Sequence, residues 1–224
     1  ATVIFSSGTT GEPKGVMLSH FNIVSNMESF GMVLWFTPDD NMCASLPFFH
    51  SFGFTCTLWF PMITGFSVCY HPNPLEGDKI AEIVRTHRSA ILLATPTFLL
   101  QYIRRADKDD FHALRYVITG AEKLRARIAE AFEKKFALAP LEGYGVTEMT
   151  PVVSVNVPDI DTGRSIQVGT KKGTIGRAVP GPASRRGCLR PAAGGLPTGC
   201  GRSAAPGAVR GPRAARRTRS ERRP

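Results

Sequence analysis

Ser6-Ser7-Gly8-Thr9-Thr10-Gly11-Glu12-Pro13-Lys14-Gly15 is the stretch on which the interpretation of this sequence depends. Four hydroxyl residues, three glycines and one lysine lie within these ten positions, which we call the hydroxyl-rich loop. Glycines let backbone N–H groups approach an anion closely, hydroxyls add hydrogen-bond donors, and a lysine supplies a mobile positive charge. The composition of the loop therefore predicts a polyphosphate-binding segment.

The order of residues separates this loop from a Walker A motif. In a Walker A loop, Gly-Lys-Ser/Thr leads directly into a helix. Here Lys14 precedes Gly15, and the following residues, Val16-Met17-Leu18, favour an extended segment. The alternative to phosphate binding is a flexible Ser/Thr/Gly turn between two strands. The density of hydroxyls and glycines favours the phosphate-binding interpretation.

Strand and helix signals alternate around and beyond the loop. Apolar runs predict strands at residues 2–5, 90–94 and 116–119. Apolar residues at helical spacing predict one helix after an N-cap at Ser19, and others at 78–88, from Pro96, and at 122–136. The first of these helices carries Phe21, Val24 and Met27 at helical spacing, and the second places Ile80, Ile83, Val84 and His87 on one face. This alternation predicts an α/β domain with layered helices on a mostly parallel sheet.

The net charge of +10 is concentrated at one end of the chain. Residues 1–181 hold 17 basic and 17 acidic side chains, whereas residues 182–224 hold 11 arginines against one acid. We therefore divide the chain into a globular part, 1–181, and a low-complexity basic tail, 182–224. The tail consists mainly of Arg, Ala, Gly and Pro, so it has little apolar surface to offset the entropy of ordering and is expected to be disordered.

Two interpretations of the tail are open. It could be a basic arm that binds RNA or membrane phosphates. It could also be an out-of-frame translation of a GC-rich gene, because the codons of its four commonest residues are GC-rich. We favour the second interpretation, and nucleic acid is not an expected partner.

The cysteines and the first residues of the sequence give information on the cellular compartment. Five cysteines are present, with no CxxC pair and no metal-ligand spacing to histidine. This pattern favours a reducing, cytosolic compartment. The sequence opens on an apolar stretch without an initiator Met or a secretory leader pattern, so we expect the natural start to lie upstream.

Three further segments follow the hydroxyl-rich loop along the chain, and their order matters for its interpretation. They are Gly120-Ala121-Glu122, Gly143-Tyr144-Gly145-Val146-Thr147-Glu148, and the glycine-rich residues 173–181. Together the four segments resemble the ordered motifs of the adenylate-forming, or AMP-binding, superfamily, which includes acyl-CoA synthetases, luciferases and peptide-synthetase adenylation domains. The resemblance covers residues 1–181 and implies part of the large N-terminal domain of such an enzyme, with ATP and Mg²⁺ as cofactors. Residues 173–181 would correspond to the strand pair that usually follows.

The resemblance implies roles for single residues. Tyr144 would stack on adenine, Thr147 would donate to the α-phosphate, and Glu148 would bind Mg²⁺ and take part in catalysis with Thr147. Without the family, Tyr144 alone would be interpreted as a core aromatic and Glu148 alone as a surface acid; their spacing within one six-residue turn favours the functional interpretation. The expected nucleotide-binding residues are Ser6, Ser7, Gly8, Thr9, Thr10, Gly11, Lys14, Gly120, Ala121, Glu122, Tyr144, Gly145 and Thr147.

Residues 41–75 contain no Asp, Glu, Lys or Arg, and they include the aromatic run LPFFHSFGF. Scattered Pro, Gly, Ser and Thr argue against a membrane span, so we expect a buried helix and strand. The resemblance places the acid-binding pocket here, with His50 as a catalytic gate near the carboxylate. A hydrogen-bonded core histidine is the alternative. Because an amino-acid substrate would need a carboxylate to pair with its ammonium group, a fatty or other apolar acid is the expected substrate.

At finer detail the sequence most resembles the acyl-ACP synthetase half of bifunctional 2-acylglycerophosphoethanolamine acyltransferase/acyl-ACP synthetases. The expected activity is formation of acyl-AMP and then a thioester with CoA or acyl carrier protein, in the cytoplasm, with peripheral membrane contact in the parent enzyme. Members of the family are more than twice as long and carry a catalytic lysine in a C-terminal domain, so we expect this 224-residue chain to be a fragment with impaired activity. A basic protein that acts through its tail, and a degenerate product without function, are the alternatives.

Overall fold

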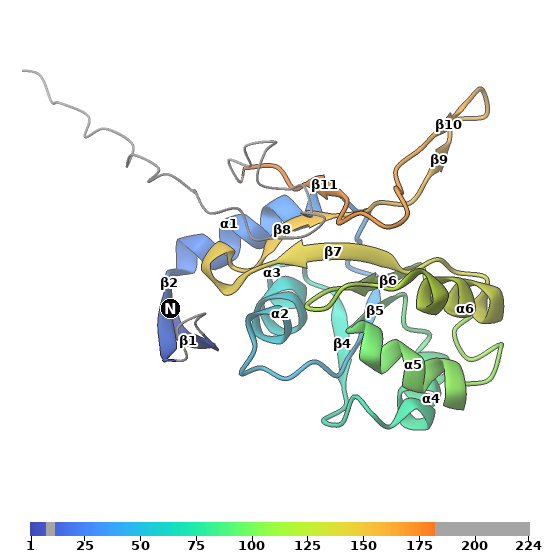
Figure 1. Ribbon diagram of the computed structural model, residues 1–224, viewed down its shortest axis with the longest axis horizontal. Helices are drawn as coiled ribbons and strands as arrows, with labels where there is room; N and C mark the ends of the chain where they lie inside the picture. Colours follow the sequence, from blue (N-terminus) through green and yellow to red (C-terminus); the bar gives the residue numbers. More distant parts are fainter. Residues whose placement is uncertain (8–11, 182–224) are drawn as a thin grey trace, which may run out of the picture. The chain divides into compact units, whose positions relative to one another are not determined.

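A seven-stranded sheet forms the centre of the computed structural model, which describes residues 1–7 and 12–181. Its strand order is β11-β8-β7-β6-β5-β3-β4 (Figure 1). The strands β3 (Asn41–Ala44), β4 (Ser67–Tyr70), β5 (Ile91–Ala94), β6 (Tyr116–Thr119) and β7 (Leu141–Gly145) are parallel. The strands β8 (Val152–Val155) and β11 (Arg177–Ala178) add an antiparallel edge. The predicted α/β class with a mostly parallel sheet is confirmed.

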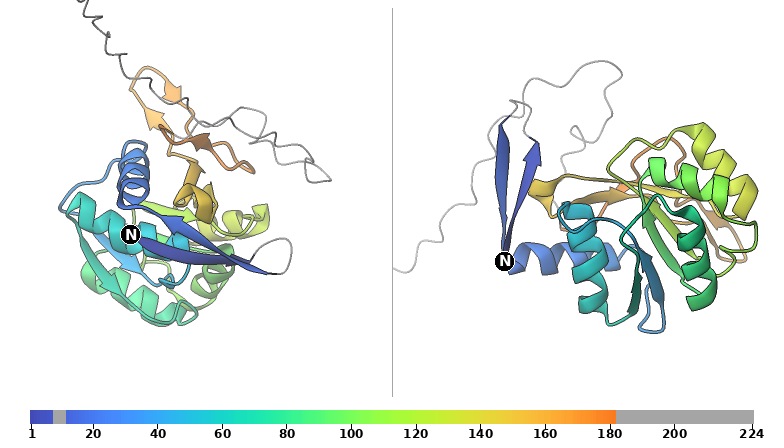
Figure 2. Two further views of the ribbon diagram at one scale, coloured as in Figure 1. Left: turned by 90° about the vertical axis from the view of Figure 1, so that its left-hand side faces the viewer. Right: turned by 90° about the horizontal axis from the view of Figure 1, so that it is seen from below.

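Helices cover both faces of this sheet (Figure 2). On one face lie α4 (Gly77–His87), α5 (Pro96–Arg105) and α6 (Ala126–Phe136). On the other lie α1 (His20–Gly31), α2 (Ser51–Gly53), the π-helical turn η1 (Phe54–Trp59) and α3 (Phe60–Thr64). Because alternate residues of a strand point to opposite faces, Leu92 of β5 packs against α4–α6, whereas Ile91 and Leu93 pack on the side of α1 and α3. A strand buried on both faces needs a continuous apolar run, and β5 has one.

The hydroxyl-rich loop belongs to a separate two-stranded hairpin. Its strands, β1 (Thr2–Ser7) and β2 (Pro13–Leu18), pair antiparallel, with Ser6 opposite Lys14. Ile4 and Leu18 anchor the hairpin on Ile23 of α1. The strand and the extended segment that were predicted on the two sides of the loop are both present. The tip of the loop, residues 8–11, and the predicted basic tail, 182–224, lie outside the described residues.

Ser19 caps α1 as predicted. Its hydroxyl accepts from the Asn22 backbone N–H at 3.1 Å, and the Asn22 side chain accepts from the Ser19 N–H at 3.0 Å. The buried face of the helix is Ile23, Met27 and Phe30, however, and Phe21 is 78% exposed. A spacing of three residues at every step drifts around a helix with 3.6 residues per turn, so Phe21 and Met27 lie on different faces.

Three other sequence predictions are corrected. His87, placed with Ile80 and Val84 on one face, is exposed at the end of α4. The helix expected from residue 122 begins at Ala126, because the preceding residues form the turn after β6. Residues 173–181 contain a single short strand, β11, which pairs with β8 rather than with a second strand of the same segment.

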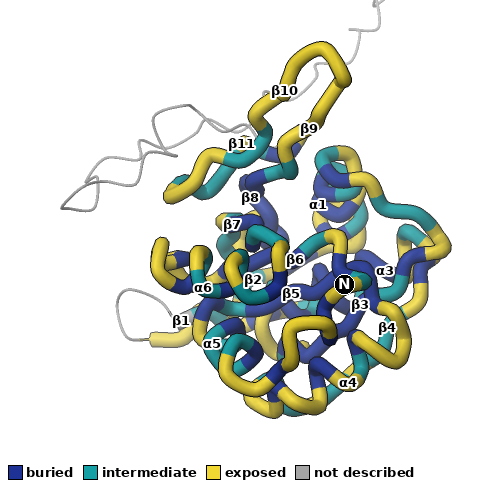
Figure 3. Tube along the Cα trace, turned by 90° about the vertical axis from the view of Figure 1, so that its right-hand side faces the viewer, coloured by how far each residue is buried: buried dark blue, intermediate teal, exposed yellow. Residues whose placement is uncertain are grey.

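A second pair of strands, β9 (Ile160–Asp161) and β10 (Ile166–Gln167), forms an exposed ribbon that lies between β8 and β11 in the sequence (Figure 3). Asp159 lies beside the ribbon, and its carboxylate accepts from the backbone N–H groups of Gly169 and Thr170. No helix in residues 1–7 and 12–181 combines the length and the apolar character that a bilayer crossing requires.

Candidate functional site

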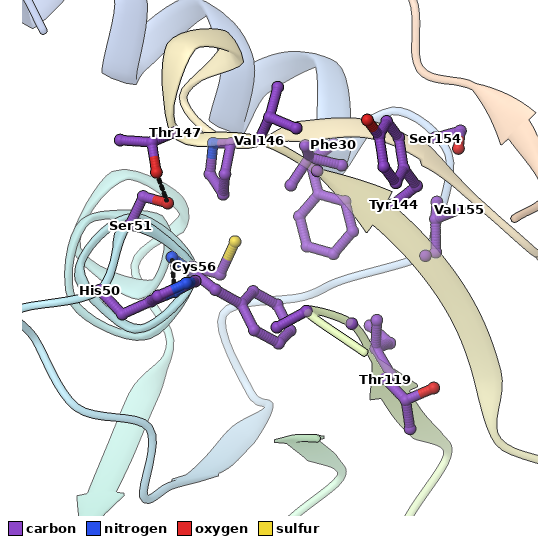
Figure 4. Close-up of a pocket in the computed structure, with 18 residues that line it drawn as sticks. Phe30, His50, Ser51, Cys56, Thr119, Tyr144, Val146, Thr147, Ser154 and Val155 are labelled. Carbon is purple, nitrogen blue, oxygen red and sulfur yellow. Dashed lines mark hydrogen bonds between the residues drawn. The ribbon is translucent and has the colours of Figure 1, made fainter. Parts of the chain in front are cut away.

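A cavity of about 150 Å³ lies where β6 and β7 end, beside the start of α2 (Figure 4). In open α/β sheets, ligands bind outside the carboxyl ends of the parallel strands, and this cavity occupies that position. The residues that line it are Phe30, His50, Ser51, Phe52, Cys56, Ile118, Thr119, Gly120, Ala121, Gly143, Tyr144, Gly145, Val146, Thr147, Pro151, Val152, Ser154 and Val155. Its volume is about half the lower limit of roughly 300 Å³ for small-molecule pockets, so it can enclose one part of a larger ligand.

The turn after β6 forms one wall of the cavity. Ala121 has a φ of +66°, a left-handed conformation that turns the chain sharply at the end of the strand. A Cβ at Gly120 would make van der Waals contact with the Phe52 ring at 3.4 Å, so the turn lies directly against α2. Glu122 does not line the cavity, because its carboxylate accepts from the Thr97 hydroxyl at 2.7 Å at the start of α5.

The opposite wall is the end of β7. Tyr144 is 43% exposed and lines the cavity with its flanking glycines. A Cβ at Gly145 would collide with the carbonyl group of Pro151, and one at Gly143 would lie 3.1 Å from the Ser154 carbonyl oxygen. The two glycines therefore allow β7 and the chain that returns into β8 to pack closely, which holds Tyr144 at the cavity edge.

Thr147 begins the short 3₁₀ turn η2 (Thr147–Met149) and lines the cavity. Its hydroxyl lies 3.2 Å from the hydroxyl of Ser51, the first residue of α2 (Figure 4). The next residue, Glu148, is exposed and lines a separate recess against α1, together with Asn22 and Ser25. Thr147 therefore faces the cavity, whereas its neighbour Glu148 faces the recess against α1.

His50 lines the cavity from the start of α2. Its Nδ1 accepts from the backbone N–H of Phe52 at 3.1 Å, so it caps the helix. This bond leaves Nε2 as the protonated nitrogen of a neutral ring. Partial burial lowers the pKa of His50 below its usual value, which favours that neutral form. The ring can therefore donate one hydrogen bond from Nε2 without carrying a charge.

The predicted residues of the hydroxyl-rich loop lie apart from the cavity, as far as they are described. Ser6, Ser7 and Lys14 belong to the paired strands of the hairpin, and Lys14 is exposed. Neither Ser6 nor Lys14 lines the cavity. Strand β2 contacts η2, however, so the strand that follows the loop meets the turn that carries Thr147 and Glu148. Gly8, Thr9, Thr10 and Gly11 lie outside the described residues.

The cavity is uncharged. Among the described residues, no Asp, Glu, Lys or Arg lines it. Within the same residues, no three His, Cys, Asp or Glu side chains converge as a metal site would require. The lining of the cavity therefore offers a metal ion no carboxylate ligand among the described residues.

The sequence of residues 1–185 matches the AMP-binding enzyme family. This chain belongs to the AMP-binding enzyme family. It is 32% identical over 157 residues to "Probable 4-coumarate–CoA ligase 3" of Dictyostelium discoideum, a match that covers 67% of this chain and 28% of the relative. It is 29% identical over 162 residues to "Long-chain-fatty-acid–CoA ligase" of Bacillus subtilis (strain 168), covering 70% of this chain and 28% of that enzyme.

The fold is shared with solved structures of other proteins. The crystal structure of ATP-bound MatB from Rhodopseudomonas palustris matches with a TM-score of 0.69 at 30% identity, covering 80% of this chain and 33% of MatB. The chain thus spans about a third of the length of these relatives. The coarser part of the resemblance, membership of the AMP-binding family, is confirmed.

Several residues that line this cavity were not predicted from the sequence. Ser51 was read only as part of an aromatic run, and its position became evident through its contact with Thr147, 96 residues away. Phe30 and Val152 line the cavity from α1 and β8, and each reads in sequence as an ordinary core residue. Thr119, directly before the Gly120 turn, is fully buried, and its hydroxyl has no hydrogen-bond partner among the described residues. The sequence signal that could have identified Thr119 is a hydroxyl residue at the end of the otherwise apolar strand β6.

Proposed function

We propose that this chain is the nucleotide-binding part of an ATP-dependent acid–thiol ligase. The parent reaction would join an apolar carboxylic acid to AMP with release of pyrophosphate, and then transfer the acyl group to a thiol. One observation carries the proposal: the Gly120–Ala121 turn, Tyr144 and Thr147 line one cavity at the carboxyl end of the parallel sheet. Residues far apart in sequence that share the AMP-binding motifs therefore lie around a common space.

Each residue has a role that its position supports. Tyr144 is held at the cavity edge with part of its ring exposed, where adenine could stack on it. The Thr147 hydroxyl lies at the same cavity, where it could donate to an α-phosphate oxygen as charge develops there. The hydroxyl-rich loop would contact the outer phosphates, and the contact of β2 with η2 supports this assignment.

The uncharged lining supports an apolar acid. Phe30, Phe52 and Cys56 form the side of the cavity toward α1 and η1. An ammonium group placed there would lose its hydration without gaining a carboxylate partner, which is costly. A neutral His50 with Nε2 free to donate could hold the substrate carboxylate beside the nucleotide. We therefore propose a fatty or similarly apolar acid as substrate, and His50 as its gate.

A magnesium ion fits the donor set in one specific way. Mg²⁺ usually keeps several waters and is held by one or two carboxylates together with substrate phosphates. Glu148 directly follows Thr147 and is exposed, but it lines the recess against α1 rather than the cavity, so its carboxylate could provide such a ligand only to an ion on the recess side of Thr147. When bound, the ion would neutralise phosphate charge, and Glu148 is the protein ligand that we propose for it; within the described residues no three His, Cys, Asp or Glu side chains converge to hold it.

The acceptor and the compartment are finer proposals. The names of the relatives from D. discoideum and B. subtilis include CoA as the acceptor, and we propose CoA or acyl carrier protein for this chain. The segments at residues 46–55 and 140–159, which resemble acyl-ACP synthetases, support the second choice. Peripheral membrane contact and a cytoplasmic location remain predictions from the sequence.

The substrate class can be tested by binding alone. The probes are two non-hydrolysable adenylates in which a sulfamoyl group replaces the phosphate, one with a medium-length alkyl chain and one with a glycyl group. We expect the 224-residue chain to bind the alkyl compound at least tenfold more tightly by calorimetry, because only that acyl group suits an uncharged cavity. Equal affinity would contradict the apolar-acid assignment, and no binding of either compound would contradict the nucleotide-site assignment.

A further inference from the structure

We infer that Ser51 is a positioning residue that orients the proton of Thr147 toward the phosphate of the bound nucleotide. The inference rests on the function proposed above, in which Thr147 meets the α-phosphate. It adds a residue that lies outside the four AMP-binding motifs and next to the histidine of the acid-binding segment. Its basis is the contact of 3.2 Å between the two hydroxyl oxygens.

Ser51 is buried, with 1% of its surface exposed. Its hydroxyl has one hydrogen-bond partner among the described residues, and that partner is Thr147. A buried hydroxyl that kept its proton unpaired would lose the energy of its hydrogen bond to water. By distance either hydroxyl can be the donor, and both residues line the cavity. Because Ser51 is the more buried of the two, we assign its proton to the Thr147 oxygen and take Ser51 as the donor of the pair.

This direction determines where the Thr147 proton points. Each hydroxyl carries one proton and can accept as well as donate. With its oxygen accepting from Ser51, Thr147 has its own proton free for a second partner, and the cavity is the open space beside it. A chain of two hydroxyls that ends on a phosphate oxygen is polarised along its length, which strengthens the terminal bond.

The backbone around Ser51 is held in place, as a positioning residue requires. His50 caps α2 through its Nδ1, and the His50 backbone N–H donates to the Pro47 carbonyl at 3.2 Å. A Cβ at Gly53 would collide with the same Pro47 carbonyl oxygen, so α2 packs tightly on residues 46–47. The Thr57 hydroxyl also donates to the Gly53 carbonyl at 2.7 Å. Ser51 therefore offers Thr147 a rigid partner.

The test compares AMP with adenosine, which lacks the phosphate, by calorimetry on the 224-residue chain. We expect Ser51→Ala to weaken AMP binding by about 3- to 10-fold, the equivalent of one hydrogen bond, and to change adenosine binding less than about twofold. Ser51→Thr, which keeps the hydroxyl, should restore the preference for AMP. In a Thr147→Val background, Ser51→Ala should have no further effect, because the group through which it acts is absent.

Ser45→Ala is the matched control. Ser45 is also buried, and its hydroxyl also pairs with another hydroxyl, that of Tyr102 at 3.4 Å, but it does not line the cavity. This variant should leave the ratio of AMP to adenosine affinity unchanged. If Ser51→Ala left AMP and adenosine binding unchanged, or weakened both by the same factor, the assignment of Ser51 would be overturned. If the unsubstituted chain bound adenosine as tightly as AMP, the proposed phosphate contact of Thr147 would itself be wrong.

Discussion

Asn26 of α1 and Val152 of β8 lie 126 residues apart in sequence and are joined by two hydrogen bonds. The Asn26 side-chain nitrogen donates to the Val152 carbonyl at 2.8 Å, and the Val152 backbone N–H donates to the Asn26 side-chain oxygen at 3.1 Å. One buried amide thus satisfies both backbone groups of a residue that lines the cavity. The pair fixes α1 against the edge of the sheet where the candidate site lies.

Asn26→Ala should lower the free energy of unfolding by about 2–4 kcal/mol, because it leaves two buried backbone groups unpaired. Urea denaturation measures this change. The control is Asn73→Ala, whose side chain bonds Glu76 and the Leu75 N–H near the surface, and which should cost less than about 1 kcal/mol. Equal losses in the two variants would show that the bridge from α1 to β8 adds nothing to stability.

Gly176→Ala and Gly173→Ala form a matched pair near the last strand. Both glycines have positive φ, +80° at Gly176 and +75° at Gly173, so both substitutions impose similar backbone strain of about 1 kcal/mol. A Cβ at Gly176 would also collide with the backbone of Val155 and Asn156, whereas a Cβ at Gly173 meets nothing within 4 Å. We expect Gly176→Ala to cost at least about 3 kcal/mol in urea unfolding. Similar costs would mean that β11 does not pack on β8 as described.

Glu142 makes stability depend on pH. Burial raises the pKa of this carboxyl, and the hydrogen bond from the Leu124 N–H at 3.0 Å opposes part of that increase. Because the folded-state pKa lies above the unfolded value near 4.5, folding favours the protonated form. That contribution is fully present below pH 4.5 and is lost as pH rises through the folded-state pKa.

Glu142→Gln removes the charge, so it should stabilise the protein more at pH 7.5 than at pH 4, as measured by urea midpoints at each pH. Glu82→Gln is the contrasting control. The hydrogen bond from Lys79 lowers the pKa of Glu82, so its substitution should give no gain at neutral pH. A gain for Glu142→Gln that is the same at both pH values would contradict the burial of its charge as the cause.

Features that depend on local chemistry could be predicted from the sequence. Ser19 is an N-cap because its hydroxyl and Asn22 complete a bond pattern within four residues, and Pro96 begins α5 because its ring fits a first turn. The apolar run of β5 also predicted a buried strand, because a strand that is buried on both faces needs a continuous apolar run. The ordered motifs at 120–122 and 143–148 located most of two cavity walls.

Features that depend on contacts between distant segments could not be predicted. Phe21 is as apolar as Phe30, and only the packing of α1 on the sheet decides that Phe30 is buried. Glu122 binds Thr97, 25 residues away, so its side chain turns from the cavity that Gly120 lines. The separate directions of Thr147 and Glu148 follow from the η2 turn, which no residue pattern in the motif specifies.

AMP binding by Tyr144→Ala tests the central claim most directly, because Tyr144 is the aromatic residue proposed to stack on adenine. The control is Tyr70→Ala: Tyr70 is also on a parallel strand and is 49% exposed, close to the 43% of Tyr144, but it does not line the cavity. Calorimetry on the 224-residue chain should show that Tyr144→Ala weakens AMP binding by about 5- to 100-fold, the loss expected for one stacked base, and that Tyr70→Ala leaves it within about twofold. Unchanged AMP affinity in Tyr144→Ala, or an equal loss in Tyr70→Ala, would contradict the assignment of this cavity as the nucleotide site.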